Sequence, residues 1–338
     1  MKTIKDVAAL AGVSLTTVSR VINNSEKVSP KTKIKVDSAI KELGYFPNNA
    51  ARSLVKKQTD SIAIVLRNLY DPFFTDLIRG IEDAALELER NVIFCSPGKK
   101  ENVRDRYIEY LTNGISDAII IYGSLFSDKA MINHLQAVNF PFLLIENNFQ
   151  TIPANQFLID NVTGAKLAID YLIKNGHKRI AHIMGNPNKK VILERFNGYT
   201  EAMQSNNLWI HDFYIMSVSG ESTRPQSQIK ELMSKPKDER PTAIFCSNDK
   251  IAIYTINVLK DLGFLVPEDV SIVGFDDLQN YNVSYQGPQI TSIKQPLYEI
   301  GHDSITCIDK ILKRELAPPV FKLYNTSLAE HATVSPVL

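Results

Sequence analysis

Apolar residues recur at helical spacing in three short stretches near the start of the chain. The apolar positions are Ile4, Val7, Ala8 and Ala11 in the first stretch, Val18, Val21 and Ile22 in the second, and Val36, Ala39, Ile40 and Leu43 in the third. Residues that favour helix ends flank these stretches, with Gly12 and Gly44 after the first and third and Ser14 and Ser29 before the second and third. The pattern predicts three short helices, each with one buried face.

From residue 60 onward, short apolar runs alternate with longer amphipathic stretches. The runs that the pattern predicts as strands are residues 61–66, 91–95, 117–121, 142–145, 179–184, 243–246 and 271–275. Strands that alternate with helices form a parallel sheet, so we expect an α/β body of the doubly wound type. A change in composition near Asn161 divides this body into two comparable halves.

The composition is typical of a globular protein with more than one domain. Of the residues, 44% are hydrophobic and 22% are charged. A chain of 338 residues and 38.0 kDa is too long for one ordinary core. No apolar run reaches the roughly 18 residues that cross a bilayer, and the start lacks the apolar core of an export signal. Cys95, Cys246 and Cys307 lie far apart without disulfide or metal-ligand spacing. We therefore expect a cytoplasmic protein with no metal, cofactor or membrane partner.

The net charge of +1 hides an uneven distribution. Residues 1–59 carry eleven Lys or Arg and four Asp or Glu, a net charge of +7, whereas the remainder carries 27 basic and 33 acidic residues, a net charge of −6. A basic segment of this kind is typical of nucleic-acid binding, although a solvated pair of basic helices has the same charge. Two helices joined by a short turn that contains glycine also predict a helix-turn-helix. A three-helix bundle of the same shape, without a role in DNA binding, is the alternative.

The second predicted helix, from Leu15 to about Asn23, has an outer face suited to DNA. Thr16, Arg20 and Asn23 share this face at positions i, i+4 and i+7, and Leu15 and Thr17 lie at its exposed N-terminal end. In helix-turn-helix proteins, this end of the helix meets the base edges in the major groove.

Residues 3–57 resemble the headpiece and hinge of the lactose-repressor/galactose-repressor (LacI/GalR) family of bacterial transcriptional regulators. The matching motifs are Thr-Ile-Lys-Asp-Val-Ala-Ala-Leu-Ala-Gly-Val-Ser-Leu-Thr-Thr-Val-Ser-Arg-Val-Ile-Asn, then Val-Ser-Pro-Lys-Thr, Leu-Gly-Tyr-Phe-Pro-Asn and Ala-Ala-Arg-Ser-Leu. The resemblance extends over nearly all of the remaining chain and implies a body like that of periplasmic sugar-binding proteins. The implied parts are an all-α headpiece at 1–46, a hinge at 47–59, a first effector-binding subdomain at 60–160 plus 291–322 and a second at 161–290 plus 323–338.

The resemblance also implies roles for residues of the headpiece. Leu15 and Thr16 would be the main variable base readers, and Arg20 would contact a guanine through O6 and N7. Leucine offers only apolar contact, for example to a thymine methyl group. The phosphate contacts implied by the family involve Ser14, Thr17, Asn23 and Ser29, with Thr3, Lys27 and Thr32 as helpers. Local capping is the alternative role of the first four of these residues.

Residues 48–55 have the length of about two helical turns, which are marginal in isolation. The family implies that this hinge orders on the operator, pairs with its twin in a homodimer and enters the minor groove. There Leu54 would insert into the central base step beside Ala51, and Asn48 and Arg52 would add polar contacts. A flexible polar linker is the alternative.

Polar residues follow several of the predicted strands, at the sheet edge where open α/β sheets bind ligands. The candidate effector-binding residues are Phe73, Glu146, Lys189, Arg195, Asn248, Asp276 and Gln295. Arg195 is placed by its match to the family, and a structural ion pair is its alternative role. Arginine and carboxylate groups suit vicinal hydroxyls because each forms paired hydrogen bonds. Only one of Phe73 and Phe74 is expected to face the cleft, and Asp249 and Asp277 fit helix caps as well as ligand groups.

The chain lacks Gly-x-Ser-x-Gly, phosphate-loop and His-Glu-x-x-His patterns, so we do not expect an enzyme. The sequence predicts instead a sequence-specific, homodimeric regulator, most simply a repressor of sugar or related carbon metabolism. It is expected to bind pseudo-palindromic, double-stranded operator DNA and to be switched by a small polar effector, a sugar or sugar derivative. A regulator controlled by a partner protein and a solute-binding protein without a DNA function are the alternatives.

Overall fold

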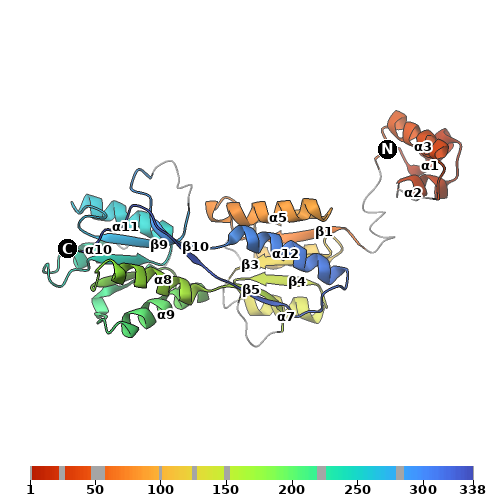
Figure 1. Cartoon of the computed structure of the whole chain (residues 1–338). Helices are drawn as coiled ribbons and strands as arrows, with labels where there is room; N and C mark the ends of the chain where they lie inside the picture. The colour runs from red at the N-terminus through yellow and green to blue at the C-terminus, as the bar shows by residue number, and fades with distance from the viewer. Residues whose placement is uncertain are drawn as a thin grey trace. The chain divides into compact units, whose positions relative to one another are not determined.

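The computed structural model describes residues 2–22, 27–46, 58–98, 101–123, 128–147, 153–218, 226–278 and 285–337. The chain divides into two compact units, Met1–Thr59 and Asp60–Leu338, here called the head and the body. The head is all-α and the body is α/β, as the sequence predicts (Figure 1).

Three helices form the described part of the head. They are α1 (Ile4–Ala11), α2 (Leu15–Ile22) and α3 (Pro30–Leu43). Their apolar faces meet in a small core, in which Val7, Val18 and Val36 are fully buried. Gly12 and Gly44 end α1 and α3 with φ angles of 64° and 59°, in the left-handed region that glycine adopts most readily. The three predicted apolar faces and both glycine caps are therefore confirmed.

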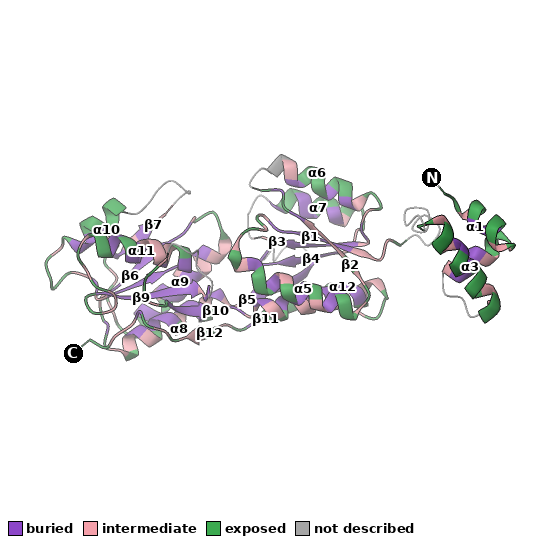
Figure 2. Ribbon diagram, turned by 90° about the horizontal axis from the view of Figure 1, so that it is seen from above, coloured by how far each residue is buried: buried purple, intermediate pink, exposed green. Residues whose placement is uncertain are grey.

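The first lobe of the body is built on a six-stranded parallel sheet. The strand order is β11 (Phe321–Tyr324), β5 (Asn155–Ile159), β4 (Phe142–Ile145), β3 (Ala118–Tyr122), β1 (Ser61–Val65) and β2 (Asn91–Cys95). The covering helices are α5 (Thr75–Glu87) and α12 (Leu297–Leu312) on one face and α6 (Glu101–Thr112) and α7 (Lys129–Ala137) on the other (Figure 2). Alternate residues of β1 enter the two cores: Ile62 and Ile64 join one, and Ala63 and Val65 join the other.

The second lobe repeats this plan. Its strand order is β12 (Ser327–Ala329), β10 (Thr291–Lys294), β9 (Ser271–Asp276), β8 (Ala243–Cys246), β6 (Ile180–Met184) and β7 (Ile215–Ser217). The covering helices are α8 (Asn161–Lys174) and α9 (Lys190–Ser205) on one face and α10 (Gln226–Met233) and α11 (Asp249–Asp261) on the other. Only the edge strand β12 runs antiparallel to its neighbour among these described strands. Strands buried on both faces explain why the sequence shows continuous apolar runs.

The chain passes between the lobes after β5, after β10 and after β11. The first passage coincides with the composition change near Asn161, but the other two correct the boundaries expected from the sequence. Residues 291–294 pair with β9 in the second lobe rather than opening the return to the first. Leu323 and Tyr324 still pair with β5 of the first lobe. Both passages come later than expected because each strand completes its hydrogen bonds before the chain leaves its sheet.

Glycine allows α5 and α12 to pack closely. A Cβ atom on Gly301 would lie 2.2 Å from the carbonyl oxygen of Leu77, and one on Gly80 would lie 2.1 Å from that of Tyr298. We expect Gly301→Ala to lower the free energy of unfolding of the body by about 1–3 kcal/mol, because a helix backbone must move to admit the methyl group. Urea denaturation measures the change.

The matched control is Gly123→Ala, whose Cβ atom would meet its nearest neighbour at an ordinary 3.5 Å. This variant should unfold close to the wild-type urea concentration. Equal unfolding midpoints for Gly301→Ala and the wild type would show that α5 and α12 can admit the methyl group without a loss of stability.

Candidate functional site

The outer face of α2 and the residue before it present a set of side chains to solvent. Ser14, Leu15, Thr16 and Arg20 are exposed, and Thr17 is half-buried. Ser14 Oγ accepts a hydrogen bond from the Thr17 N–H at 3.1 Å and lies 2.9 Å from the Thr17 hydroxyl oxygen. Leu15 keeps 44% of its surface exposed and therefore does not serve the small core of the head. The local structure combines a capped helix start with an outward-facing leucine, threonine and arginine.

The other predicted contacts in the head also lie near helix starts. Ser29 Oγ accepts from the Thr32 N–H at 3.3 Å, and Thr3 precedes α1, where its N–H donates to the Asp6 carboxylate at 2.8 Å. Lys27, Ser29 and Thr3 are exposed. Helix N-termini attract phosphate because their N–H groups and dipole favour negative charge. Asn23, Asn48, Ala51, Arg52 and Leu54 lie outside the described residues.

In the body, a buried network surrounds Arg195 of α9. Arg195 is 5% exposed, and its Nη1 donates to the Ser247 carbonyl at 2.6 Å and to Asp276 Oδ1 at 3.3 Å. The Nε donates to Asn161 Oδ1 at 2.9 Å, and Cζ lies 3.6 Å from the ring centre of Phe275. Arg195 thus makes the ion pair that was its alternative role and also lies beside the polar groups at the strand ends.

Asp276 and Gln295 complete the polar cluster beside Arg195. Gln295 Nε2 donates to Asp276 Oδ1 at 2.6 Å, whereas the Oε1 atom of Gln295 is buried and accepts no hydrogen bond from the described residues. Burial raises the pKa of Asp276 to about 6, and the positive charge of Arg195 opposes this rise. Asp276 also has a φ of 114°, which is strained for a residue with a side chain. Arginine, carboxylate and an unsatisfied amide oxygen therefore converge at the carboxyl ends of β9 and β10.

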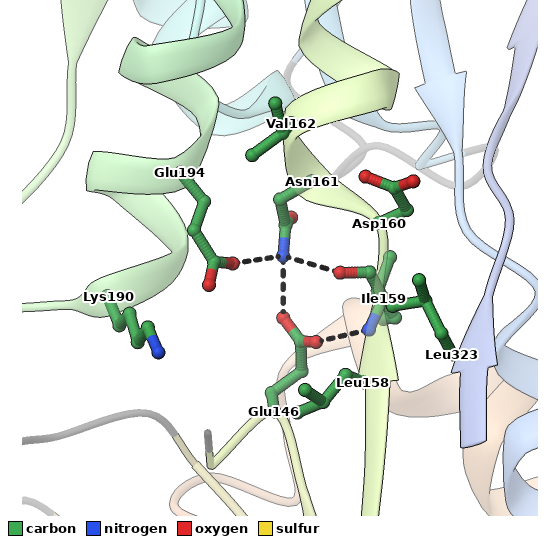
Figure 3. Close-up of a pocket in the computed structure, with 9 residues that line it drawn as sticks. All are labelled: Glu146, Leu158, Ile159, Asp160, Asn161, Val162, Lys190, Glu194 and Leu323. Atoms are coloured by element: carbon green, nitrogen blue, oxygen red, sulfur yellow. Dashed lines mark hydrogen bonds between the residues drawn. The ribbon is translucent and has the colours of Figure 1, made fainter. Parts of the chain in front are cut away.

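Glu146 lies at the end of β4 and borders a cavity of about 120 Å³ (Figure 3). Its Oε1 accepts from the Ile159 N–H at 2.8 Å, and its Oε2 accepts from Asn161 Nδ2 at 3.1 Å. The same Nδ2 donates to Glu194 Oε2 at 3.1 Å. Asn161 and Glu194 are not among the residues predicted from the sequence. Asn161 follows the end of β5, so a correct prediction of that strand would have marked it.

Asn248 and Lys189 occupy helix starts in the second lobe. Asn248 is the N-cap of α11, and its Oδ1 accepts from the Ile251 N–H at 2.9 Å. Lys189 precedes α9 and is exposed, yet surrounding protein displaces part of its hydration and lowers its pKa, and the positive charge of Arg67 lowers it further. Capping occupies one atom of Asn248, which leaves its Nδ2 as a donor.

Asp249 and Asp277 have structural roles. The Asp249 carboxylate is fully buried and accepts from the Ser292 hydroxyl at 2.6 Å and from the Leu278 N–H at 2.8 Å. Asp277 Oδ1 lies 3.2 Å from His331 Nε2. These contacts fasten the loop after β9 to its neighbours rather than cap a helix.

Phe73 lies at the edge of the first lobe, in the short 3₁₀ helix η1 (Pro72–Phe74). It is half-buried and packs edge-on against Tyr122, whereas Phe74 is buried. Asp71 holds η1 through the Phe73 N–H at 3.1 Å and also pairs with Lys250 of the second lobe at 2.5 Å. Phe74 thus enters the core and Phe73 does not, as expected of only one of the two rings. Beside Phe73, the ion pair between Asp71 and Lys250 joins the two lobes.

No helix among the residues in the described ranges is long and apolar enough to cross a membrane.

Comparisons with known proteins match both units. Residues 3–48 match the model of bacterial regulatory proteins of the lacI family, and residues 59–320 match that of periplasmic binding proteins and the sugar binding domain of the LacI family. The chain is 33% identical over 335 residues to the HTH-type transcriptional regulator RegA of Clostridium saccharobutylicum, covering 98% of this chain and 99% of that protein. It is 30% identical to the HTH-type transcriptional repressor PurR of Vibrio atlanticus (strain LGP32), covering 99% of each. The fold is similar to that of the lac repressor dimer bound to operator and an anti-inducer, with a TM-score of 0.86, 25% identity and 99% of each chain covered.

Proposed function

Because the chain belongs to the lacI family of bacterial regulatory proteins and is a DNA-binding transcriptional repressor of that family, we propose how its two units divide the work. The head of each subunit in a cytoplasmic homodimer binds one half of a pseudo-palindromic operator. The body binds a small polar metabolite, a sugar or sugar derivative, between its lobes. Binding of this effector changes the affinity for the operator and so controls genes of sugar or related carbon metabolism.

The DNA-binding part of the proposal rests on the exposed face of α2. Arg20 is the one arginine of this helix, and its planar fork matches the O6 and N7 atoms of guanine. Thr16 adds a hydroxyl, and Leu15 adds an apolar contact for a thymine methyl group. Ser14, Thr17, Ser29 and Thr32 stand at helix starts, where a phosphate oxygen accepts from hydroxyl and N–H groups.

The operator is expected to be symmetric and its binding strongly dependent on salt. Each head has a net charge of +7, and two heads that neutralise several phosphates release the corresponding counterions. We expect the operator affinity to fall by roughly three orders of magnitude between 50 and 200 mM salt. Binding-site selection followed by titrations at several salt concentrations tests both points. An asymmetric selected site, or an affinity that is flat in salt, contradicts the proposal.

The effector-binding part rests chiefly on the cluster of Arg195, Asp276 and Gln295. Within the described part of the chain, the buried Oε1 of Gln295 lacks a hydrogen-bond donor, and an unsatisfied buried acceptor of this kind costs about 1–3 kcal/mol. A ligand hydroxyl supplies that donor, while the Asp276 carboxylate and the guanidinium accommodate a neighbouring hydroxyl. Phe73 offers an apolar ring, and the Nδ2 of Asn248 and the ammonium of Lys189 offer further donors.

The switch requires a ligand that prefers one arrangement of the lobes. Phe73 and Glu146 belong to the first lobe, whereas Arg195, Asn248 and Asp276 belong to the second. A ligand that contacts both sets favours the arrangement in which they are close, and only such differential affinity shifts the population that binds DNA.

The experiment titrates a panel of neutral sugars, sugar derivatives and nucleosides into the complex of the protein with its selected operator, with fluorescence anisotropy as the readout. Release or tightening of the operator by one compound, and its loss in Asp276→Asn, supports the proposal. A response that survives in this variant places the effector elsewhere.

A further inference from the structure

A single buried amide connects the cavity beside Glu146 to the guanidinium of Arg195. We propose that Asn161 is a positioning residue of the effector site, which fixes Arg195 and makes its position depend on the carboxylates of Glu146 and Glu194. This inference rests on the proposed function, because Arg195 is one of the proposed effector-binding groups.

Every polar atom of the Asn161 side chain is engaged. The residue is 1% exposed and starts α8 directly after the chain has left the first lobe. Its Oδ1 accepts from Arg195 Nε at 2.9 Å, and its Nδ2 donates to Glu146 Oε2 and Glu194 Oε2, both at 3.1 Å (Figure 3). A rotated amide would place its donor against the arginine and its oxygen against both carboxylates. The network therefore holds the amide in one orientation.

The two carboxylates come from different lobes. Glu146 follows β4 of the first lobe, and Glu194 belongs to α9 of the second, one residue before Arg195. Asn161 Nδ2 lies between them and has two hydrogens to share, with the Ile159 carbonyl as a third acceptor at 3.2 Å. A change at either carboxylate thus alters what the amide contacts, and the opposite end of the same amide holds the guanidinium.

Protonation is one such change. Burial raises the pKa of Glu146 to about 7; the charge of Glu194 also raises it, while hydrogen bonds from Ile159 and Asn161 and the charge of Arg195 lower it. The pKa of Glu194 is raised too, first by burial. Near neutral pH the pair therefore gains or loses a proton. A protonated oxygen of Glu146 becomes a donor and no longer accepts from the amide.

Other charged groups near the pair are few in the described part of the chain. Asp160 and Lys190 line the same cavity, and Asp160 caps α8 through the Thr163 N–H. The hydroxyl of Tyr122 interacts with the charge of Glu146, and its pKa is raised well above the usual value by burial, so it stays protonated. Asp276, on the other side of Arg195, has a pKa that burial raises to about 6, and burial and the charge of Asp276 raise the pKa of Asp249.

The experiment records the Nε–Hε NMR signal of Arg195 in the full chain labelled with ¹⁵N-arginine, between pH 5 and 8. Loss of one signal in Arg195→Lys assigns it. We expect two steps in the shift of this signal, with midpoints near pH 6 and pH 7. Glu146→Gln should remove only the upper step and Asp276→Asn only the lower one. Asn161→Ala should also remove the upper step. In this variant Glu146 itself should still titrate in the neutral range, as seen in its ¹³C-glutamate signal, which is assigned by its absence from Glu146→Gln.

Asn155→Ala is the matched control, because Asn155 is also a buried amide and its Nδ2 donates to the Phe142 carbonyl at 2.7 Å. It should lower the stability but keep both steps. An upper step that persists in Asn161→Ala, or that Asn155→Ala removes equally, overturns the inference. The readout uses neither DNA nor effector. If the upper step of the Arg195 signal depends on Asn161 but no effector changes the operator affinity, the inference stands and only the proposed function is overturned.

Discussion

Asp276→Asn is expected to raise the effector concentration needed for half-maximal response at least about 30-fold, equivalent to about 2 kcal/mol. The substitution preserves the size of the side chain but removes the charge that faces Arg195 at 3.3 Å. It also converts one acceptor oxygen into a donor, which a ligand hydroxyl then meets unfavourably. Operator affinity without effector should stay within twofold of wild type, because the change leaves the head intact. Anisotropy titrations of labelled operator measure both quantities.

The same variant should lose a pH dependence that the wild type has. Burial raises the pKa of Asp276 to about 6, so the carboxylate accepts from a ligand hydroxyl fully only above that pH. The wild-type response should therefore strengthen as pH rises from 5 to 7, and the Asp276→Asn response should lack this component. Asp261→Asn, at an exposed carboxylate of α11, is the control and should match the wild type. A wild-type sensitivity to effector in Asp276→Asn would remove Asp276 from the site.

Apolar patterning predicts the strands that consist mainly of apolar residues. The runs at 91–95, 142–145 and 243–246 match β2, β4 and β8 residue for residue. The strands β5, β7, β10, β11 and β12 are not among the predicted runs because their apolar patterns are weaker. β5 begins with Asn155 and Gln156, and the edge strand β11 leaves Phe321 64% exposed. A polar start or a solvated edge interrupts the run of apolar residues that identifies a central strand.

The sequence predicts several residues of the candidate effector site but not the hydrogen bonds that join them. Arg195, Asp276 and Gln295 lie far apart in the sequence, and the rule that ligands bind beyond strand ends places only Asp276 of the three, because residues 291–294 are not predicted as a strand. The rule gives no hydrogen-bond partners. Asn161 joins Arg195 to Glu146 only because the chain changes lobes at its position. Such a contact depends on how two lobes pack, and no local pattern encodes it.

Arg20→Ala is expected to reduce affinity for the selected operator by roughly 30-fold or more, because each of the two heads loses a bidentate base contact worth about 1–3 kcal/mol. Arg20 is exposed on α2 and does not belong to the apolar core of Val7, Val18 and Val36. Its removal should therefore leave the helices of the head intact, which circular dichroism and a melting curve check. Affinity for random DNA should fall only slightly, since one of eleven basic residues in the head is lost.

The base preference separates a base contact from a phosphate contact. A base reader specifies one position, so the Arg20→Ala variant should tolerate any base pair at the position where the wild type requires G·C. Lys41→Ala removes an equal charge from the last turn of α3, away from the start of α2 in sequence, and should keep the wild-type preference at every position. Binding-site selection with both variants measures this. If Arg20→Ala weakened specific and random DNA equally and kept the full preference, Arg20 would contact a phosphate, and base recognition would fall to Leu15 and Thr16.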